Sequence, residues 1–279
     1  MPVGRSLRPT DLIPTVLIPT KECPMPPALR LAVWQGHSAN GDLAAAVQTL
    51  LPALRAAGAM GADCLIVPEI WLAGYNQPDI AETAMPRGSA ALVRLAAACA
   101  ETGCGLVVGY AEATGTGVAN AALYFDAQGA EAANYRKIQL YGPREKAIYA
   151  AGDSYVVFDL AGHKAAMLIC YDVEFSHHVK ALADQGVEVI LVPTANMVPY
   201  VHVPRLTVPA MAANHGVAIA YANYCGSEGD LTYTGGSVIV GPHGEVLAQA
   251  GDGVALLIAD LPQRDPVRLS SQSADLRTL

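Results

Sequence analysis

Three reactive side chains each lie at or just past the end of a predicted strand. Glu69 follows Leu-Ile-Val-Pro, Lys137 follows Asn-Tyr-Arg, and Cys170 follows Met-Leu-Ile. Catalytic groups commonly lie where a strand of a rigid scaffold meets a loop. Taken singly, each residue has a structural interpretation without catalysis. A charged Glu or Lys at the end of a strand is usually solvated, and a Cys after an apolar run is usually a small core residue. Together they supply the parts for acyl transfer through a thioester.

The three residue types suit distinct steps of that chemistry. A cysteine thiol can attack a carbonyl carbon and later leave, so Cys170 is the candidate nucleophile. We expect Glu69, if buried beside it, to have a raised pKa and to shuttle protons. Lys137 is expected to stabilise an oxyanion together with the backbone N–H of Tyr171, and to lower the pKa of the thiol. A thiol of low pKa predicts that iodoacetamide alkylates Cys170 before the other cysteines.

The order of these residues resembles the nitrilase, or carbon–nitrogen hydrolase, superfamily, whose active site is a Glu-Lys-Cys triad. The resemblance covers about residues 29–260 and rests on Val67-Pro-Glu69, Arg136-Lys137, Cys170-Tyr-Asp-Val-Glu-Phe175 and Val192-Pro-Thr-Ala-Asn196. Three motifs in order, each with strand context, make the match specific. It implies thiol-dependent hydrolysis of a small carboxamide to a carboxylic acid and ammonia, in the amidase-like branch.

The resemblance also implies a second glutamate after the Lys motif, and Glu145 matches it. By resemblance, Glu145 positions the lysine and assists proton transfer, although a loop ion pair with Arg144 or Lys146 fits the local sequence equally well. Nitrile hydrolysis and hydrolysis of an N-carbamoyl group on the same triad remain open. A non-catalytic member that only binds a ligand is the remaining alternative, which the three filled triad positions disfavour.

Residues near the motifs are expected to contact the substrate: Tyr75, Tyr171, Glu174 and Asn196. Relatives that hydrolyse N-carbamoyl amino acids carry arginines shortly after the cysteine, which hold the substrate carboxylate. This chain has no Arg between Cys170 and Val179 and has Glu174 instead. Unless Glu174 faces away from the site, this predicts that neutral or cationic amides are preferred over N-carbamoyl amino acids, with nitriles poorer still.

One departure from the superfamily pattern follows the Cys motif. Many members continue with Phe-Pro-Glu, whereas this chain has Phe175-Ser-His177. The family role of that glutamate is therefore unfilled, which affects the fine geometry of the pocket rather than the triad.

Other chemistries lack their sequence signals. The seven histidines show neither H-E-x-x-H nor zinc-ligand spacing, and neither His215 nor His243 has the surroundings of a papain-like partner for Cys170. Gly115-Thr-Gly-Val-Ala-Asn120 lacks the third Gly of a dinucleotide loop and is more typical of a turn between strands. P-loop and G-x-S-x-G motifs do not occur. We expect neither a metal nor a cofactor.

Composition narrows the possible partners. The formal net charge is −8, where a nucleic-acid-binding protein would show a basic stripe. No run of Lys and Arg suggests an anionic membrane surface, and no apolar run is long enough to span a bilayer. The six cysteines are scattered, so we expect reduced thiols in a cytoplasmic protein. The resemblance implies a two-fold homodimer or a higher homo-oligomer.

Apolar and amphipathic stretches alternate, which is typical of sheets covered by helices. We expect strands at residues 29–34, 64–68, 106–110, 121–125, 133–137, 155–160, 164–169, 187–192, 217–222, 237–240, 246–249 and 255–258. Helices are expected at residues 42–58, 90–102, 176–185 and 205–214, with Ser176 as an N-cap. Tight turns between the late strands indicate that some pairing is antiparallel.

This order fits a single α/β domain, and the resemblance implies an α-β-β-α sandwich. We assign residues 29–262 to the hydrolase domain, 1–28 to an N-terminal arm and 263–279 to a polar C-terminal tail. The arm is apolar but broken by prolines, without a signal-peptide cleavage pattern, and Met25 is a possible natural start.

Overall fold

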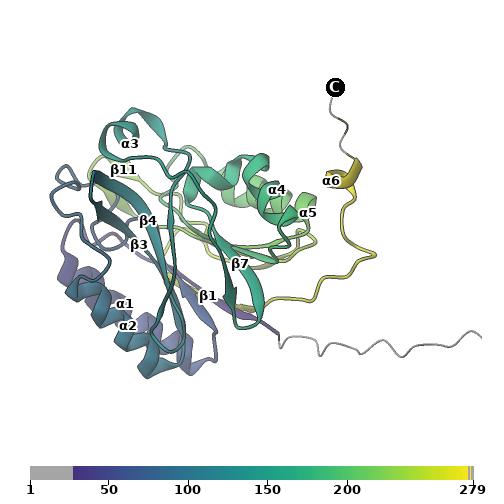
Figure 1. Cartoon of the computed structure of the whole chain (residues 1–279), viewed down its shortest axis with the longest axis horizontal. Helices are drawn as coiled ribbons and strands as arrows, with labels where there is room; N and C mark the ends of the chain where they lie inside the picture. Colours follow the sequence, from purple (N-terminus) through teal and green to yellow (C-terminus); the bar gives the residue numbers. More distant parts are fainter. Residues whose placement is uncertain (1–27, 276, 278–279) are drawn as a thin grey trace, which may run out of the picture.

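The computed structural model describes residues 28–275 and 277. It confirms the predicted α/β sandwich, because two six-stranded sheets pack face to face and helices cover their outer faces (Figure 1). The proposed N-terminal arm, including Met25, lies outside the described residues except for Ala28. Among the described residues, no helix is long and apolar enough to cross a membrane. The domain limits, the homo-oligomer and the cytoplasmic location stay predictions.

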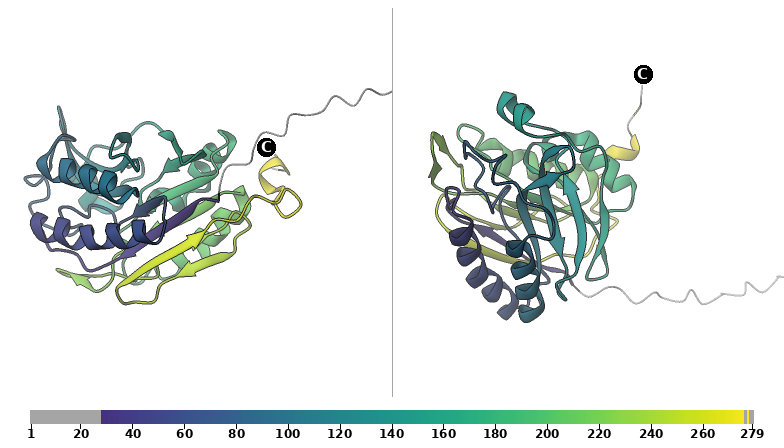
Figure 2. Two further views of the ribbon diagram at one scale, coloured as in Figure 1. Left: turned by 90° about the horizontal axis from the view of Figure 1, so that it is seen from below. Right: turned by 60° about the vertical axis from the view of Figure 1, so that its left-hand side comes forward.

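The first sheet has the strand order β14-β1-β2-β3-β4-β5. Its strands are β14 (Ala255–Asp260), β1 (Arg30–Gln35), β2 (Cys64–Ile66), β3 (Gly105–Thr114), β4 (Gly117–Phe125) and β5 (Glu131–Arg136). β1, β2 and β3 are parallel to one another, and the other pairs are antiparallel. Helices α1 (Leu43–Ala59) and α2 (Ala90–Thr102) lie side by side on the outer face (Figure 2).

The second sheet has the order β13-β12-β9-β8-β7-β6. Its strands are β13 (Val246–Gln249), β12 (Val238–Val240), β9 (Ala218–Ala222), β8 (Val189–Pro193), β7 (His163–Met167) and β6 (Val157–Leu160). β7, β8 and β9 are parallel, and the outer pairs are antiparallel, as the tight turns predicted. Helices α4 (Ser176–Asp184) and α5 (Val208–His215) cover its outer face.

Helix boundaries follow from local chemistry. The carboxylate of Asp42 accepts a hydrogen bond from the backbone N–H of Ala45, which satisfies a free donor in the first turn of α1. Gly103 ends α2 in the left-handed conformation that glycine adopts without a Cβ clash. Both helices were predicted from the period of their apolar residues, and α2 has the predicted limits.

Smaller elements connect these layers, and the sequence did not predict them as helices or strands. They are α3 (Gly142–Ile148), the 3-10 helix η1 (Cys170–Glu174), the hairpin of β10 (Ser227–Glu228) and β11 (Leu231–Thr232), and α6 (Gln272–Asp275). The single helix predicted at residues 205–214 is wrong at its start. A π-helical turn, η2 (Val203–Thr207), precedes α5, and Pro209 has no N–H to donate to the carbonyl of Arg205.

Two further expectations concern turns. Ser176 is not an N-cap, because it is the first residue of α4. Only Phe175 separates η1, which ends at Glu174, from α4, and Phe175 takes the cap position. The Oγ of Ser176 instead lies 2.9 Å from Nε2 of His215. The turn expected after Gly115 is confirmed, because Thr114 pairs with Gly117 in the hairpin of β3 and β4.

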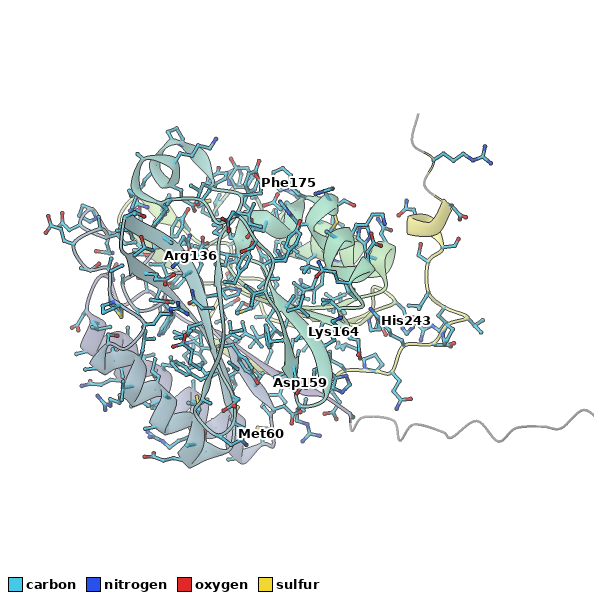
Figure 3. The ribbon with its side chains drawn as sticks, in the orientation of Figure 1. Met60, Arg136, Asp159, Lys164, Phe175 and His243 are labelled. Atoms are coloured by element: carbon cyan, nitrogen blue, oxygen red, sulfur yellow. The ribbon has the colours of Figure 1, made fainter. Side chains whose placement is uncertain are left out.

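The core has two hydrophobic clusters, and alternate residues of a strand contribute to one or the other. Leu31 and Val33 of β1 contribute to the cluster between the two sheets, whereas Ala32 packs toward α1 and α2. This period of two places successive side chains on opposite faces of the sheet. Figure 3 shows side chains filling the space between the sheets. Burial on both faces explains why β2, β8 and β9 are continuously apolar.

The ends of the strands bring the candidate residues together. Glu69 follows β2, Lys137 follows β5, and Cys170 follows β7. The backbone N–H of Glu69 donates to the carbonyl of Thr194, just beyond β8, so the strand ends of the two sheets are directly joined at this edge. The fold therefore gathers residues from both sheets at one edge of the sandwich.

Gly109 in β3 makes this close approach possible. A Cβ at Gly109 would lie 2.6 Å from the carbonyl oxygen of Pro68 and 2.9 Å from the backbone carbon of Glu69. Gly109→Ala should therefore push the Glu69 loop away from β3 and lower the free energy of unfolding by roughly 1–3 kcal/mol, as overpacking does elsewhere. Urea unfolding followed by circular dichroism would measure this loss.

Gly88→Ala is the matched control, because a Cβ at Gly88 would meet nothing within 4 Å. Its unfolding midpoint should equal that of the wild type. If Gly109→Ala were as stable as Gly88→Ala, the close contact between β3 and the Glu69 loop would not constrain the fold.

Candidate active site

Cys170 lies at a strained turn that starts directly after the end of the apolar run. Its φ is +48°, in the left-handed region that residues with a Cβ rarely adopt. Such backbone conformations persist where the surrounding structure determines them, and they cluster at functional sites. Cys170 also begins η1, and it is the one cysteine in the described part of the chain that is not fully buried.

Asp172 holds this turn in place. Its carboxylate accepts hydrogen bonds from the backbone N–H of Ile169 at 2.9 Å, from the hydroxyl of Tyr135 at 2.8 Å and from the backbone N–H of Gln139 at 2.7 Å. Burial raises the pKa of Asp172 to about 6, against the opposing effect of Lys137 and of these hydrogen bonds. Asp172 thereby ties the turn at Cys170 to the strand and loop on either side of Lys137.

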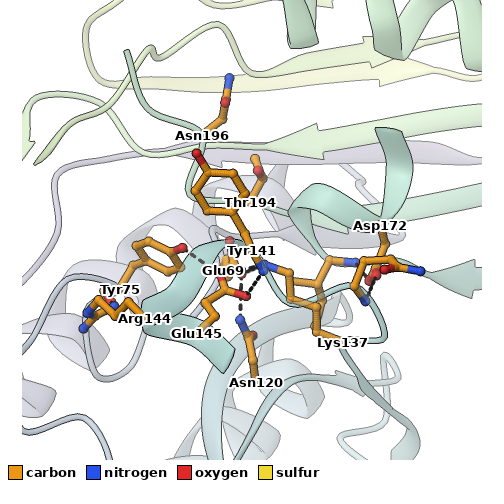
Figure 4. A network of polar contacts seen from close by, with 12 residues as sticks. Glu69, Tyr75, Asn120, Lys137, Tyr141, Arg144, Glu145, Asp172, Thr194 and Asn196 are labelled. Atoms are coloured by element: carbon orange, nitrogen blue, oxygen red, sulfur yellow. Dashed lines mark hydrogen bonds and ion pairs between the residues drawn. The ribbon is translucent and has the colours of Figure 1, made fainter. Parts of the chain in front are cut away.

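Lys137 is fully buried between two carboxylates (Figure 4). Its Nζ lies 2.7 Å from Oε1 of Glu69 and 2.8 Å from Oε1 of Glu145. Glu69 and Glu145 are themselves buried. The sequence-predicted Glu, Lys and second Glu thus form one ion-paired cluster.

Neutral donors complete the hydrogen bonding of both carboxylates. Asn120 donates to Oε1 of Glu69 at 2.7 Å, and the hydroxyl of Tyr75 donates to Oε1 of Glu145 at 2.6 Å. The backbone N–H of Tyr141 donates to Oε2 of Glu145 at 2.8 Å. Glu145 is therefore not in a loop ion pair with its neighbours; Arg144 instead donates to the backbone carbonyls of Tyr75 and Gln77.

Hydrogen bonds to the backbone hold Lys137 and Glu69 in place. The N–H of Lys137 donates to the carbonyl of Asn120 at 2.8 Å, and the carbonyl of Lys137 accepts from Gly152 at 2.8 Å. The hydroxyl of Tyr224 donates to the carbonyl of Glu69 at 2.8 Å. Since the chain is held on both sides of each residue, the side chains start from defined positions.

The electrostatics differ from the sequence expectation at one residue. Burial raises the pKa of Glu69, as predicted, and Glu145 adds to the increase while Lys137 opposes it. Burial alone would lower the pKa of Lys137, but Glu69, Cys170 and Glu145 raise it well above its usual value. Lys137 is therefore an ammonium ion.

The expected low pKa of the Cys170 thiol is wrong. Burial and the charge of Glu69 raise this pKa well above its usual value, and they outweigh the lowering effect of Lys137 and of a hydrogen bond with Thr194. The thiol is neutral at rest, so its reaction with a carbonyl needs a base. Selective alkylation of Cys170 would then reflect its access to the cavity rather than a resting thiolate.

Two hydrogen-bonding positions of the cluster are not used by the described residues. Oε1 of Glu69 accepts from Lys137 and Asn120, whereas Oε2 has no hydrogen-bond partner among the described residues. An ammonium group has three N–H donors, and Lys137 uses two of them on Glu69 and Glu145. An acceptor for a proton and a donor for an oxyanion are therefore both available.

A cavity of about 290 Å³ opens onto Cys170. Its lining residues are Tyr141, Cys170, Tyr171, Glu174, Asn196, Met197, Tyr200 and His202. Three of the four predicted substrate-binding residues, Tyr171, Glu174 and Asn196, are among them. The fourth, Tyr75, does not line the cavity but lies buried behind Glu145.

Several residues that contact the cluster or line the cavity escaped the sequence-based prediction, notably Asn120, Thr194, Tyr141, Tyr200 and His202. Asn120 carried a signal, because it is the one polar residue in an otherwise apolar part of β4. The role of Asp172 inside the Cys motif was also missed. Among the described residues, no group of three or more His, Cys, Asp or Glu could hold a metal ion.

Comparison with known proteins agrees with this geometry. Residues 30–266 match the model of the carbon–nitrogen hydrolase family. The chain belongs to this family. Carbon–nitrogen hydrolases act on non-peptide C–N bonds, and the relatives place this one in the amidase-like branch of the nitrilase superfamily, as the sequence predicted.

Three similar proteins illustrate the branch. A protein named hydrolase in pqqF 5′ region, from Pseudomonas protegens, is 38% identical over 240 residues, which cover 85% of this chain and 84% of that protein. An (R)-stereoselective amidase from a Pseudomonas species is 32% identical over 225 residues, with 80% and 81% covered. The crystal structure of an amidase from Nesterenkonia sp. has a TM-score of 0.82 and 34% identity, covering 90% of this chain and 94% of that one.

A further structure of the Nesterenkonia amidase bears on the nucleophile. A mutant of that enzyme shows covalent addition of the acetamide moiety of fluoroacetamide at its active site cysteine. Its chain matches 91% of this carbon–nitrogen hydrolase at 34% identity, with a TM-score of 0.82. A cysteine thus reacts with an amide-bearing compound in a closely similar fold.

The ion-paired cluster of this carbon–nitrogen hydrolase predicts a strong effect of Glu145→Gln. Whichever way the new amide turned, its NH2 group would face a donor, either Lys137 and Tyr75 or the N–H of Tyr141. We expect kcat for a small amide to fall by about 10–100-fold, less completely than on loss of the thiol. Ammonia release would measure kcat.

Glu101→Gln is the matched control, since Glu101 is exposed on α2 and far from the cluster in sequence. It should have wild-type kinetics. Wild-type kinetics in Glu145→Gln as well would mean that the charge of Glu145 is not needed to place Lys137.

Proposed function

We propose that this chain hydrolyses a small carboxamide to a carboxylic acid and ammonia through a thioester on Cys170. The observation that carries the proposal is that Oε2 of the buried Glu69 has no hydrogen-bond partner among the described residues, beside an ammonium that is already fixed by two carboxylates. The similarity to an (R)-stereoselective amidase and to the Nesterenkonia amidase supports the choice of amides.

The acylation step uses the two positions of the cluster that the described residues leave unused. Glu69 takes the proton from the thiol of Cys170 as the sulfur attacks the carbonyl carbon and forms the C–S bond. The oxyanion of the tetrahedral intermediate accepts hydrogen bonds from the third N–H of Lys137 and the backbone N–H of Tyr171. Glu69 then gives its proton to the amide nitrogen, the C–N bond breaks, and ammonia leaves.

In deacylation, water replaces the thiol as the nucleophile, and Glu69 again accepts and returns the proton. Glu69 takes a proton from a water molecule that attacks the thioester carbon, and Lys137 and Tyr171 again hold the oxyanion. The C–S bond breaks, the sulfur recovers a proton from Glu69, and the carboxylic acid leaves. Glu145 touches no reacting atom in this scheme; it positions Lys137 and the backbone of Tyr141.

A first prediction tests the nucleophile. Cys170→Ala removes the sulfur with little change of volume, so turnover of amides should be abolished while the circular dichroism spectrum stays native. Cys64→Ala is the control, because Cys64 lies in the core between the sheets. Substantial residual activity in Cys170→Ala would exclude the thioester route.

A second prediction ranks the C–N substrates. Among the described residues, the cavity lining contains neither Arg nor Lys, which removes the bidentate partner that a carboxylate of an N-carbamoyl amino acid would need. We expect kcat/KM to be highest for butyramide, lower for N-carbamoyl-alanine and lowest for butyronitrile. Faster turnover of the carbamoyl acid or the nitrile would reverse this ranking without affecting the triad.

A further inference from the structure

Glu174 is a carboxylate in the wall of the cavity that has no hydrogen-bond or salt-bridge partner among the described residues. It ends η1, four residues after Cys170, and lines the same cavity. The other carboxylates near the thiol, those of Glu69, Glu145 and Asp172, accept hydrogen bonds from buried donors. Glu174 forms neither a hydrogen bond nor a salt bridge with any residue that the structure describes. The sequence alternative in which Glu174 faces away from the cavity is therefore not what the fold adopts.

The surroundings of Glu174 make its charge costly. The side chain is partly buried, and burial raises its pKa, while His202 and Lys137 lower it. A carboxylate that loses water without gaining a hydrogen bond or a salt bridge is destabilised, and a cation delivered by a ligand removes that cost. The unpaired carboxylate favours a cationic ligand.

Aromatic rings complete a site that suits an ammonium ion. Tyr141 meets Tyr171 edge-on at 5.4 Å and Tyr200 at 6.2 Å between ring centroids, and all three line the cavity. A ring face attracts a cation through its quadrupole, and a carboxylate beside it adds a charge-assisted hydrogen bond. Among the described lining residues no Lys or Arg would repel the cation.

The position of Glu174 limits where the cation can lie on the substrate. A 3-10 helix rises about 2 Å per residue, so four residues place Glu174 about 8 Å beyond Cys170 along η1. An acyl group bound to the sulfur, extended by a few bonds and a hydrogen bond, spans such a distance.

We propose that this cavity selects amides whose acyl chain carries an ammonium group a few bonds from the carbonyl, with Glu174 as its counter-ion. The inference rests on the proposed amidase function. Aminoalkyl amides and amino-acid amides are the substrate class.

The experiment compares two substrates of the same shape. β-Alaninamide ends in an ammonium group where butyramide ends in a methyl group, and ammonia release reports on both. In the wild type, kcat/KM should be at least about tenfold higher for β-alaninamide, the effect of one favourable ion pair in a partly desolvated site. In Glu174→Gln, the ratio should fall to about one.

Two further variants complete the test. Glu174→Asp keeps the charge and should keep a ratio clearly above that of Glu174→Gln, whereas Glu101→Gln should keep the wild-type ratio. The wild-type ratio remains a test of the ammonium site even if Glu174→Gln does not fold.

Equal turnover of both amides by the wild type would overturn the ammonium site and leave the amidase function standing. No turnover of either, nor of other simple amides, would overturn the proposed function itself. A high ratio that survives in folded Glu174→Gln would place the cation elsewhere and reject Glu174.

Discussion

The buried ammonium of Lys137 is the constraint on which the site depends. Moving a charge from water into a protein interior costs several kcal/mol unless partners and hydrogen bonds replace the water. Here two carboxylates, those of Glu69 and Glu145, flank the ammonium at 2.7 and 2.8 Å. Two carboxylates exceed one ammonium by one negative charge, so neutral donors are needed as well, and Asn120 and Tyr75 supply them. Removal of Lys137 would leave two buried carboxylates without a counter-ion, and removal of Asn120 or Tyr75 would leave a buried carboxylate oxygen short of a donor.

The sandwich architecture satisfies this constraint because its strand ends converge. Glu69 and Lys137 come from the first sheet and Cys170 from the second, so no single sheet could assemble the cluster. Asp172 joins the two halves by accepting from backbone groups on both sides. Its raised pKa, about 6, reflects the burial that this link requires. The geometry of the thiol and of the lysine is therefore set by the packing of the sheets against each other.

The parts of the site that local sequence carries were predictable, and the parts that depend on packing were not. Motif order and the apolar strands before Glu69, Lys137 and Cys170 led to the fold and to the reactive residues. Asn120 contacts Glu69 across 51 residues of sequence, and its polar side chain in an apolar stretch does not reveal which residue it contacts. The thiol pKa was misjudged for the same reason: burial and the charge of Glu69 raise it more than Lys137 lowers it, and the depth of burial depends on packing.

The pairing of Lys137 with two carboxylates has a mechanistic consequence in the proposed scheme. If Lys137 had no carboxylate partners, its charge would stabilise a resting thiolate and would be partly used before the substrate arrived. Because burial and the charges of Glu69 and Glu145 raise the pKa of the thiol, it stays protonated, and its proton moves to Glu69 only during the attack. This transfer leaves the net charge of the buried cluster unchanged, because a charge lost from Glu69 reappears on the sulfur and then on the oxyanion. The cost of burying the cluster is then similar before and during the reaction. As Glu69 becomes neutral it releases the ammonium, whose attraction for the oxyanion is strongest at that moment.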